Sequence, residues 1–506
     1  MASFNVSFQV LAGVFTFLAL CSLLGRRRHI LPLPPGPRGL PLIGNMWDIA
    51  RSQDLSWIRY WKWAQVYGDI FQLRILGHRT IVLNSREAMT TLLEKRSYNY
   101  SDRPDMHMFL DKQLVGTEWG FFTFRHNDWW RLHRRTVHQR FQPRVMPEYY
   151  NIQRTAAESL MGKLAASPAN FFDHINNYAG SILLKITYGY TLQEKDDPYM
   201  CLVLGAMEGI DKSGSHGFFW VDYFPFLKYV PAWFPGGGFK IKAREWKEAN
   251  SRLKNEPWNW VKRAIEEGSA EPSFCIRLIE RSSITPGDNS VMEDVIKNCA
   301  ANAFVAGAET TAATLCCFIL AMSLHPELQI RAQTEIDSVV GPLGGTLDFS
   351  DRDKLPFVNA LIAETLRWHP VAPLGVAHRA LIDDEYAGYF IPAGTTIIAN
   401  AWTALHDEKL YGPDPTAFNP YRFMMGGREG PPNPELFAFG FGRRICPGRY
   451  LAMNSIYLAV SRLIATFTIA RPLDDAGNEI TPEIAFADGV VRYTKLPPHG
   501  RVHKKN

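Results

Sequence analysis

A single cysteine near the C-terminus lies in a setting suited to metal ligation. Cys446 follows the run Phe439-Gly-Phe-Gly-Arg-Arg-Ile and precedes Pro447-Gly448. Glycine permits close backbone approach and positive φ, and a metal-bound thiolate needs nearby N–H donors that tune its electron donation. A helix is expected to start at Gly448, where its N-terminal dipole would lower the pKa of the thiol. We therefore predict that Cys446 is a thiolate ligand of a metal.

Two other interpretations of the run from Phe439 to Gly448 (the thiolate loop) are a dinucleotide-binding loop and a buried structural cysteine. A dinucleotide-binding loop would need a third glycine at the position that Ile445 occupies, so the Gly440-x-Gly442 pair does not fit that fingerprint. A lone cysteine is most often a small buried hydrophobic residue. That role gives no reason for three glycines and two arginines around one sulfur.

A second group with chemical potential is an acid followed by two threonines inside a long apolar helix. The run Ala306-Gly307-Ala-Glu309-Thr310-Thr falls within a helix expected from about Met292 to Leu324. A crossing between two small-residue helix faces is the alternative explanation of the small residues, but it does not explain the acid and the hydroxyls. Positioned acids and hydroxyls of this kind can transfer protons.

Four helices and several strands must position these groups. Besides the helix over 292–324, helices are expected from Pro326 to just before Gly341, from Pro356 to Trp368, and from Pro447 to about Ala470. Strand patterns occupy Ile70–Leu76, Thr80–Leu83, Tyr389–Ile391 and Thr395–Ala399. The prediction is a mainly α protein with a small β-sheet near each end of the chain.

The N-terminus predicts a membrane anchor. Phe4 to Leu24 is apolar and uncharged over 21 residues, long enough to span a bilayer, and Arg26, Arg27 and Arg28 follow. Basic residues stay on the cytoplasmic side, which would leave the body cytosolic. A cleaved signal peptide would instead carry its charge before the apolar run. We expect an anchor over 1–25, a basic and proline-rich hinge over 26–45, and one large domain over 46–506.

Composition excludes several classes of protein. Hydrophobic residues make up 46% of the 506 and charged residues 21%, which is globular rather than disordered. A net charge of +5 is too mild for a nucleic-acid binder. Seven cysteines without a C-x-x-C pair predict neither a disulfide framework nor a zinc site.

The segment from Phe218 to Phe239 (the aromatic segment) holds ten aromatic residues and is interrupted by Pro225, Pro231 and Pro235. Proline excludes one long regular helix. The segment is either a loop that covers the core or, as we favour, a lip at the membrane interface, where Trp and Tyr are enriched.

The thiolate loop resembles the haem-binding signature of cytochromes P-450, and the other landmarks of that family follow in order along the body. The resemblance implies a cytochrome P-450 fold that binds haem b, with Cys446 as axial ligand and Phe439, Gly440 and Gly448 in the loop around it. The run from Ala306 is similar to the family's oxygen-binding segment. There Gly307 would let dioxygen lie against the helix, and Glu309 and Thr310 would deliver protons.

The resemblance assigns two further groups of residues. Glu364-x-x-Arg367 pairs residues on one helix face, and with Arg422 in the run Phe418-Asn-Pro-Tyr-Arg-Phe it would form a buried, structural charge triad behind the haem. The residues that would hold the haem propionates are Trp130, Arg134, Arg103, His378 and Arg444.

The implied reaction is monooxygenation with two electrons from NADPH. Because no nicotinamide fingerprint is found, a separate NADPH–cytochrome P-450 reductase should deliver them, with cytochrome b5 as a further donor, at the endoplasmic reticulum membrane. A basic face for such an acidic partner, or simply a solvated charged face, is formed by Arg131, Arg134, Arg135, Arg140 and Arg144.

Substrate contacts are expected from 106–124, the aromatic segment, Ala303, Ala306 and Val371–Gly375. These parts are apolar and predict a hydrophobic small molecule, by analogy a fungal secondary metabolite. A terpenoid is favoured, with polyketide, aromatic and alkaloid compounds as alternatives. Two other functions stay open: a reductase-independent haem-thiolate isomerase or dehydratase, and a catalytically silent membrane-tethered binding protein. The intact acid–threonine pair and signature positions speak against both.

Overall fold

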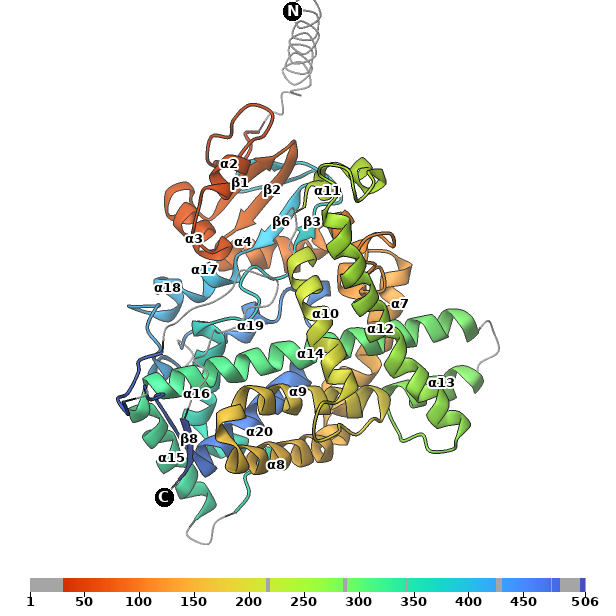
Figure 1. The fold of residues 1–506 in the computed structure, drawn as a ribbon. Coiled ribbons are helices and arrows are strands. Elements are labelled where there is room, and N and C mark those ends of the chain that lie inside the picture. Colours follow the sequence, from red (N-terminus) through yellow and green to blue (C-terminus); the bar gives the residue numbers. More distant parts are fainter. Residues whose placement is uncertain are drawn as a thin grey trace, which may run out of the picture.

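A long helix, α14 (Asn289–Leu324), passes through the centre of the helical body (Figure 1). The computed structural model describes residues 31–214, 219–284, 289–341, 345–424, 430–474, 476–482 and 501–505. Helix α14 packs against α9 (Phe171–Tyr188), α7 (Asp128–Phe141) and α20 (Arg449–Thr466). It is apolar on all sides because other helices surround it, as Phe304, Leu315 and Phe318 in the core show.

Within the described residues, one helix is long and apolar enough to cross a membrane, and it is this one. Its stretch Ser290–Leu324 is mostly buried inside the protein, so packing accounts for its apolar character. The predicted anchor, Phe4–Leu24, lies outside the described residues.

The remaining α-helices surround this centre. In the first half of the chain they are α2 (Met46–Ala50), α3 (Ser56–Tyr67), α4 (Arg86–Met89), α5 (Ser97–Tyr100), α6 (His107–Leu110), α8 (Tyr150–Ala166), α10 (Pro198–Gly214), α11 (Trp220–Tyr223), α12 (Phe239–Glu266) and α13 (Phe274–Ile284). In the second half they are α15 (Pro326–Val340), α16 (Pro356–Trp368), α17 (Ala401–Leu405), α18 (Glu408–Tyr411) and α19 (Glu435–Ala438).

Short helices of other types join these elements. One is a π-helix, η1 (Thr90–Lys95). The 3-10 helices are η2 (Phe121–Thr123), η3 (Pro143–Tyr149), η4 (Pro168–Asn170), η5 (Pro225–Tyr229), η6 (Phe349–Lys354), η7 (Pro420–Met424) and η8 (Gly442–Arg444).

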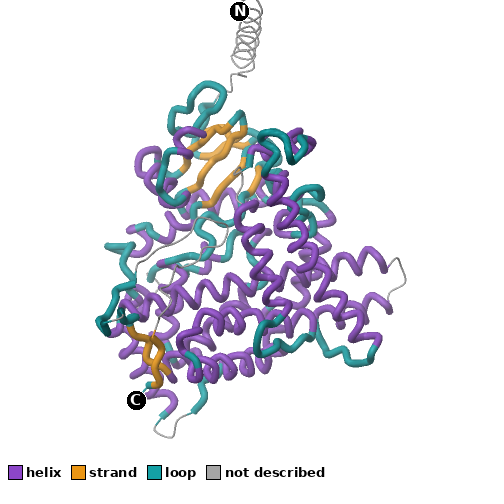
Figure 2. The backbone as a smooth tube through the Cα atoms, in the orientation of Figure 1, coloured by secondary structure: helices purple, strands orange, loops and turns teal. Residues whose placement is uncertain are grey.

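The largest sheet has four strands in the order β1-β2-β6-β3 and lies at one end of the molecule (Figure 2). Its strands are β1 (Ile70–Ile75), β2 (His78–Leu83), β6 (Thr396–Ala399) and β3 (His378–Arg379). Strand β2 pairs in parallel with β6, with Thr80 opposite Thr396, whereas the other pairs are antiparallel. The expectation of a separate sheet near each chain end was therefore wrong for these strands, because distant segments share one sheet.

Two small antiparallel pairs complete the β-structure of the described residues. Strand β4 (Asp384–Tyr386) pairs with β5 (Tyr389–Ile391), and β7 (Phe467–Ala470) pairs with β8 (Arg501–Lys504).

The helix predicted from Pro447 to about Ala470 is shorter than expected, because α20 ends at Thr466 and strand β7 follows it. Phe467 and Ile469 are buried, whereas their neighbours are half-buried. This alternation with a period of two suits a strand rather than a helix. The side-chain oxygen of Gln329 also accepts a hydrogen bond from the backbone N–H of Ile469 at 2.8 Å.

Candidate active site

The thiolate loop is a tight turn that carries Cys446 between η8 and α20. The backbone N–H of Cys446 donates to the carbonyl of Phe439 at 2.7 Å and closes the turn. Gly440 and Gly442 adopt positive φ values of 74° and 53°. A Cβ atom on Gly442 would lie 2.2 Å from the carbonyl oxygen of Leu93 in η1, so no other residue fits there. Two of the three glycines predicted to shape the loop, Gly440 and Gly442, are therefore required by its backbone, whereas Gly448 has an ordinary φ of −88°.

The sulfur of Cys446 experiences two opposing influences. Burial raises the pKa of the thiol and outweighs the lowering by the backbone N–H groups of Gly448 and Arg449 and by the charges of Arg134 and Arg449. The N–H groups at the start of α20 do lower this pKa, as expected, but the sequence interpretation did not include the loss of hydration, which is the larger effect. A cation bound to the sulfur would shift the balance toward the thiolate.

Arg444 reaches from the thiolate loop to the start of α7. Its Nε donates to the carbonyl of Ser101 at 2.7 Å and its Nη2 to the carbonyl of Phe124 at 2.7 Å. Its guanidinium lies over the ring of Trp130, 4.1 Å from the ring centre. Trp130 is fixed in turn because the side chain of Asn127 caps α7 and accepts from the Trp130 N–H at 2.9 Å.

Arg103 and His378 lie beside Arg444. Arg103 is buried, and its Nη1 donates to the carbonyls of Val376 and Ala377 at 2.6 and 2.8 Å. The Nδ1 of His378 faces the carbonyl of Tyr100 at 2.7 Å, so this nitrogen carries the hydrogen. Burial holds the pKa of His378 well below its ordinary value. The neutral ring therefore has no N–H left for a carboxylate, and it could hold one only after taking up a second proton.

Arg103 is buried and Arg444 is half-buried, and the hydrogen-bond partners of both cations among the described residues are carbonyl oxygens. Burial lowers the pKa of Arg103 to about 9 and that of Arg444 to about 8. The Nη1 of Arg444 is buried without a hydrogen-bond partner among the described residues. Buried cations in this state lack an anion. The propionates of haem would supply carboxylate acceptors here, so these residues fit that cofactor.

Arg134 lies between these groups and the sulfur. It is half-buried, and burial lowers its pKa, while Cys446 acts in the opposite direction. No group of three or more His, Cys, Asp or Glu suited to a metal occurs among the described residues. A single thiolate suits an iron whose other ligands come with its porphyrin.

The acid–threonine pair lies on α14. The Oγ1 of Thr310 donates to the carbonyl of Ala306 at 2.8 Å, and Ala306 itself is exposed. Glu309 is buried, and its Oε1 has no hydrogen-bond partner among the described residues. Burial, with a smaller effect of Asp211, raises the pKa of Glu309 to about 9. Glu309 therefore carries a proton at neutral pH.

Gly307 faces a neighbouring helix. A Cβ atom at this position would lie 3.0 Å from Cγ of Leu183 in α9, tighter than ordinary contact. The structure thus gives this glycine a packing reason, which the sequence interpretation did not include. The predicted role of Gly307 in admitting dioxygen stays a prediction.

Glu364, Arg367 and Arg422 are brought together in the core. Arg367 forms two hydrogen bonds with Glu364, at 2.6 and 2.7 Å, and both side chains are 0% exposed. The Nε of Arg422 lies 3.7 Å from Oε1 of Glu364. Carbonyl oxygens of 405–417 accept the remaining hydrogens of Arg367. The Glu364 carboxylate is thus paired with Arg367, and every N–H of the Arg367 guanidinium has an acceptor. Burial of these charges is therefore tolerable.

Two residues that position the site were not predicted. Asp102 accepts from Arg125 Nη1 at 2.7 Å and from the His126 N–H at 2.8 Å. Arg125 also donates to the carbonyl of Arg103 at 2.7 Å and so holds the backbone next to the buried Arg103 side chain. The sequence carries no signal for this contact, since the partners are more than twenty residues apart in loops.

The predicted basic face divides into two parts. Arg131, Arg135 and Arg144 are exposed, whereas Arg140 is largely covered and paired with Glu148 at 2.7 Å. The described part of the aromatic segment, 219–239, is strongly exposed at Trp233, Tyr229 and Phe226, to 82%, 70% and 63%.

Comparison with known proteins gives the family. The sequence family described as cytochrome P-450 matches residues 34–492. A cytochrome P-450 monooxygenase of Armillaria gallica is 39% identical over 493 residues, 96% of this chain and 94% of that protein. The tryptamine 4-monooxygenase of Psilocybe cyanescens is 37% identical and covers 92% of each chain. A solved zebra fish cytochrome P-450 with abiraterone matches with a TM-score of 0.71 and 25% identity over 89% of this chain and 100% of that one. These matches confirm the resemblance, and the chain belongs to the cytochrome P-450 family of oxidoreductases.

Proposed function

We propose that the chain is a haem-thiolate monooxygenase in which Cys446 ligates the iron of haem b. The observation that carries the proposal is the pair formed by the buried Arg103 and the half-buried Arg444, whose Nη1 is buried without a hydrogen-bond partner among the described residues, beside the cysteine turn. When bound, haem with a thiolate ligand supplies the activation of dioxygen. Trp130, Arg134, Arg103 and Arg444 would hold its propionates. The negative charge of a propionate would also raise the pKa of His378, so that the ring could take up a second proton and join them.

Proton supply is the role proposed for Glu309 and Thr310. Glu309 holds a proton at neutral pH, since its pKa is about 9. The hydroxyl of Thr310 donates to the Ala306 carbonyl and keeps its lone pairs available to accept a proton. A general acid of this kind contributes about 10²–10⁴-fold to a rate.

Electrons would come from NADPH through a separate reductase, with cytochrome b5 as a further donor. The exposed Arg131, Arg135 and Arg144 support an acidic partner, because complementary charge steers association. The apolar run Phe4–Leu24 and the exposed Trp233 and Tyr229 support attachment to the endoplasmic reticulum membrane by an anchor and an aromatic lip, with the body cytosolic.

The substrate proposed is an uncharged hydrophobic small molecule of secondary metabolism, with a terpenoid favoured. Ala303 and Ala306 on α14 are apolar, with Ala303 half-buried and Ala306 exposed. An ammonium group, as in tryptamine, would need an ionised carboxylate to offset its desolvation. Glu309 does not provide one, because it is protonated at neutral pH. An indole or other aromatic substrate is the second candidate, supported by the name of the Psilocybe relative.

The proposal is tested with the haem-loaded full chain and a reductase. Replacing Cys446 with Ala should abolish the thiolate signature of the reduced carbon monoxide spectrum, and an intact signature would refute the ligand assignment. Products should be heavier by one oxygen atom and should require both NADPH and reductase. Turnover without them would favour the isomerase or dehydratase, and absence of bound haem would favour the silent binding protein.

Thr310→Ala tests the proton role. The variant should consume NADPH with less product formed per NADPH. Thr334→Ala is the matched control, because Thr334 makes the same hydrogen bond to the carbonyl four residues earlier, at 3.0 Å, on the exposed surface of α15. Equal coupling in the two variants would count against the proton role.

A further inference from the structure

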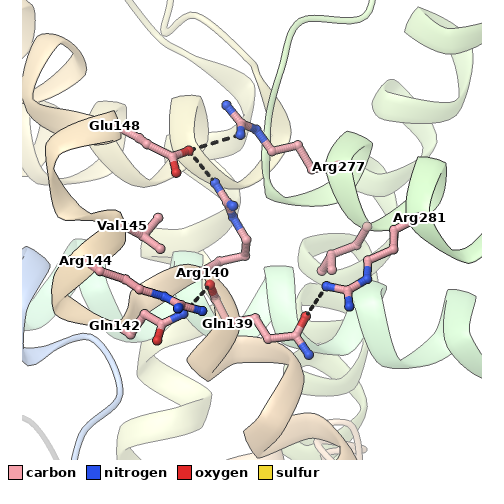
Figure 3. Close-up of a pocket in the computed structure, with 9 residues that line it drawn as sticks. Gln139, Arg140, Gln142, Arg144, Val145, Glu148, Arg277 and Arg281 are labelled. Carbon is pink, nitrogen blue, oxygen red and sulfur yellow. Dashed lines mark hydrogen bonds and ion pairs between the residues drawn. The ribbon is translucent and has the colours of Figure 1, made fainter.

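A cavity of about 520 Å³ lies away from the cysteine turn, between the C-terminal end of α7, the short helix η3 and α13. Figure 3 shows Arg140, Arg144, Arg277 and Arg281 around it, with Glu148 at one side. We call it the basic cavity. Its lining thus has four cationic side chains and one anionic side chain. A volume of this size is in the range of small-molecule sites, roughly 300–1,000 Å³.

Glu148 is the one anionic side chain in the lining of the basic cavity, which holds four arginines. One carboxylate oxygen of Glu148 accepts from both Arg140 and Arg277, at 2.7 and 3.0 Å. Arg281 donates to the neutral side-chain oxygen of Gln139 at 3.1 Å. Arg144 has no ion-pair partner among the described residues. The Nε of Arg140 is buried without an acceptor in that same part of the chain.

Local structure explains only part of this charge. A cation in the last turn of a helix is favoured by the dipole, which amounts to about half a negative charge at the C-terminus. That effect accounts for Arg140 at the end of α7. It gives no reason for Arg277 and Arg281 on α13, whose side chains point from the opposite wall toward the same space (Figure 3). Like charges gathered in one cavity repel each other unless an anion lies between them.

We propose that the basic cavity binds a phosphate-bearing anion, either a soluble phosphorylated small molecule or the phosphate of a lipid headgroup. Guanidinium groups form forked, charge-assisted hydrogen bonds with phosphate oxygens. A phosphate or diphosphate carries about two or more negative charges and balances the excess better than a single carboxylate. Val145 and Leu278 in the lining provide a small apolar surface for an organic portion.

This site is distinct from the proposed monooxygenase centre. Arg134, which the sulfur of Cys446 influences, lies six residues before Arg140 on α7, a rise of about 9 Å along a helix. Binding is measured without turnover, so failure of this proposal and failure of the proposed function are separate results.

The test uses the haem-loaded full chain and sodium pyrophosphate as the probe, titrated by calorimetry at constant ionic strength. Pyrophosphate should bind and raise the melting temperature. Replacing both Arg277 and Arg281 with Gln should weaken its affinity at least about tenfold, since each lost charge-assisted hydrogen bond is worth a factor of that order. Arg252→Gln is the control, because Arg252 is an exposed arginine on α12, paired with Glu256 and outside the cavity.

Two further outcomes are decisive. No heat and no change in melting temperature at millimolar pyrophosphate overturns the proposal, and so does equal affinity in the double variant and the Arg252→Gln control. The source of the phosphate is assigned in nanodiscs of phosphatidylcholine with and without phosphatidic acid. Weaker pyrophosphate binding in the phosphatidic acid discs means that a lipid headgroup competes for the site, and equal binding means that the ligand is soluble.

Discussion

The guanidinium of Arg444 lies over the ring of Trp130, with 4.1 Å between its central carbon and the ring centre. Two carbonyl oxygens also accept hydrogen bonds from Arg444, while its Nη1 has no acceptor among the described residues. Arg444 is therefore placed to bind a carboxylate.

We therefore expect Arg444→Gln to release haem faster by about tenfold or more, because a charge-assisted hydrogen bond is lost. Haem transfer to an excess of apomyoglobin, followed by absorbance, measures the rate. The neighbouring Arg443 is exposed, so Arg443→Gln should behave as the unchanged protein. Equal rates in the two variants would contradict a propionate contact at Arg444.

The raised pKa of Glu309 predicts a pH-dependent stability. An unfolded Glu ionises near pH ~4.3, whereas burial and Asp211 raise the folded pKa to about 9. Between these values the folded state binds the extra proton, so this residue makes stability fall as pH rises. The Glu309→Gln variant has no ionisable group at this position. As pH rises, its free energy of unfolding relative to that of the unchanged protein should therefore increase by up to about 1.4 kcal/mol per pH unit.

Melting temperatures of the haem-loaded proteins at several pH values from mildly acidic to mildly basic provide this comparison. Glu266→Gln, at an exposed carboxylate at the end of α12, is the control and should show no such trend. A pH-independent difference for Glu309→Gln would show that the carboxyl is not held protonated by burial.

Arg367→Leu should destabilise the protein by about 3–5 kcal/mol, because it leaves the buried Glu364 without its bidentate partner. Chemical denaturation of the soluble protein measures the change in the free energy of unfolding. A loss of soluble protein would also indicate destabilisation. Arg131 makes an ion pair with Asp128 at the same spacing of three residues but on the surface. Arg131→Leu should cost less than about 1 kcal/mol. Similar losses in both variants would refute the structural role of the core pair.

Gly307→Ala should cost about 1–3 kcal/mol, since its methyl group would press on Leu183. The double variant Gly307→Ala/Leu183→Ala should lose less stability than the sum of the two single variants, which a double-mutant cycle measures. The amount of product formed per NADPH is then compared between the double variant and Gly307→Ala alone. If the double variant forms more, packing explains the glycine. Persistent uncoupling would instead support the predicted role in admitting dioxygen.

Features governed by neighbouring residues were predictable from the sequence. Helix α16 runs from Pro356 to Trp368, as its proline start and its periodicity indicated. The spacing of Glu364 and Arg367 fixed their contact, and the thiolate loop adopts the turn that its glycines suggested.

Features governed by distant contacts were not predictable. Three contacts depend on how separate elements pack. They are the stacking of Arg444 on Trp130, the hydrogen bond from Arg125 to the Arg103 carbonyl, and the position of Gly307 against Leu183. The balance of effects on the thiol of Cys446 also needed the structure, since the loss of hydration on burial cannot be read from a helix start.

The strand order of the main sheet has a consequence for biosynthesis. Strand β2 pairs with β6, and the Ser101 carbonyl accepts from Arg444 across 343 residues. On the ribosome, a nascent chain has therefore completed most of its translation before either contact can form. Contacts this far apart slow folding and leave apolar strands uncovered. Strands β1 and β2 therefore wait for β6, and the proposed haem site, which draws on both Arg103 and Cys446, is complete only after residue 446 has been synthesised.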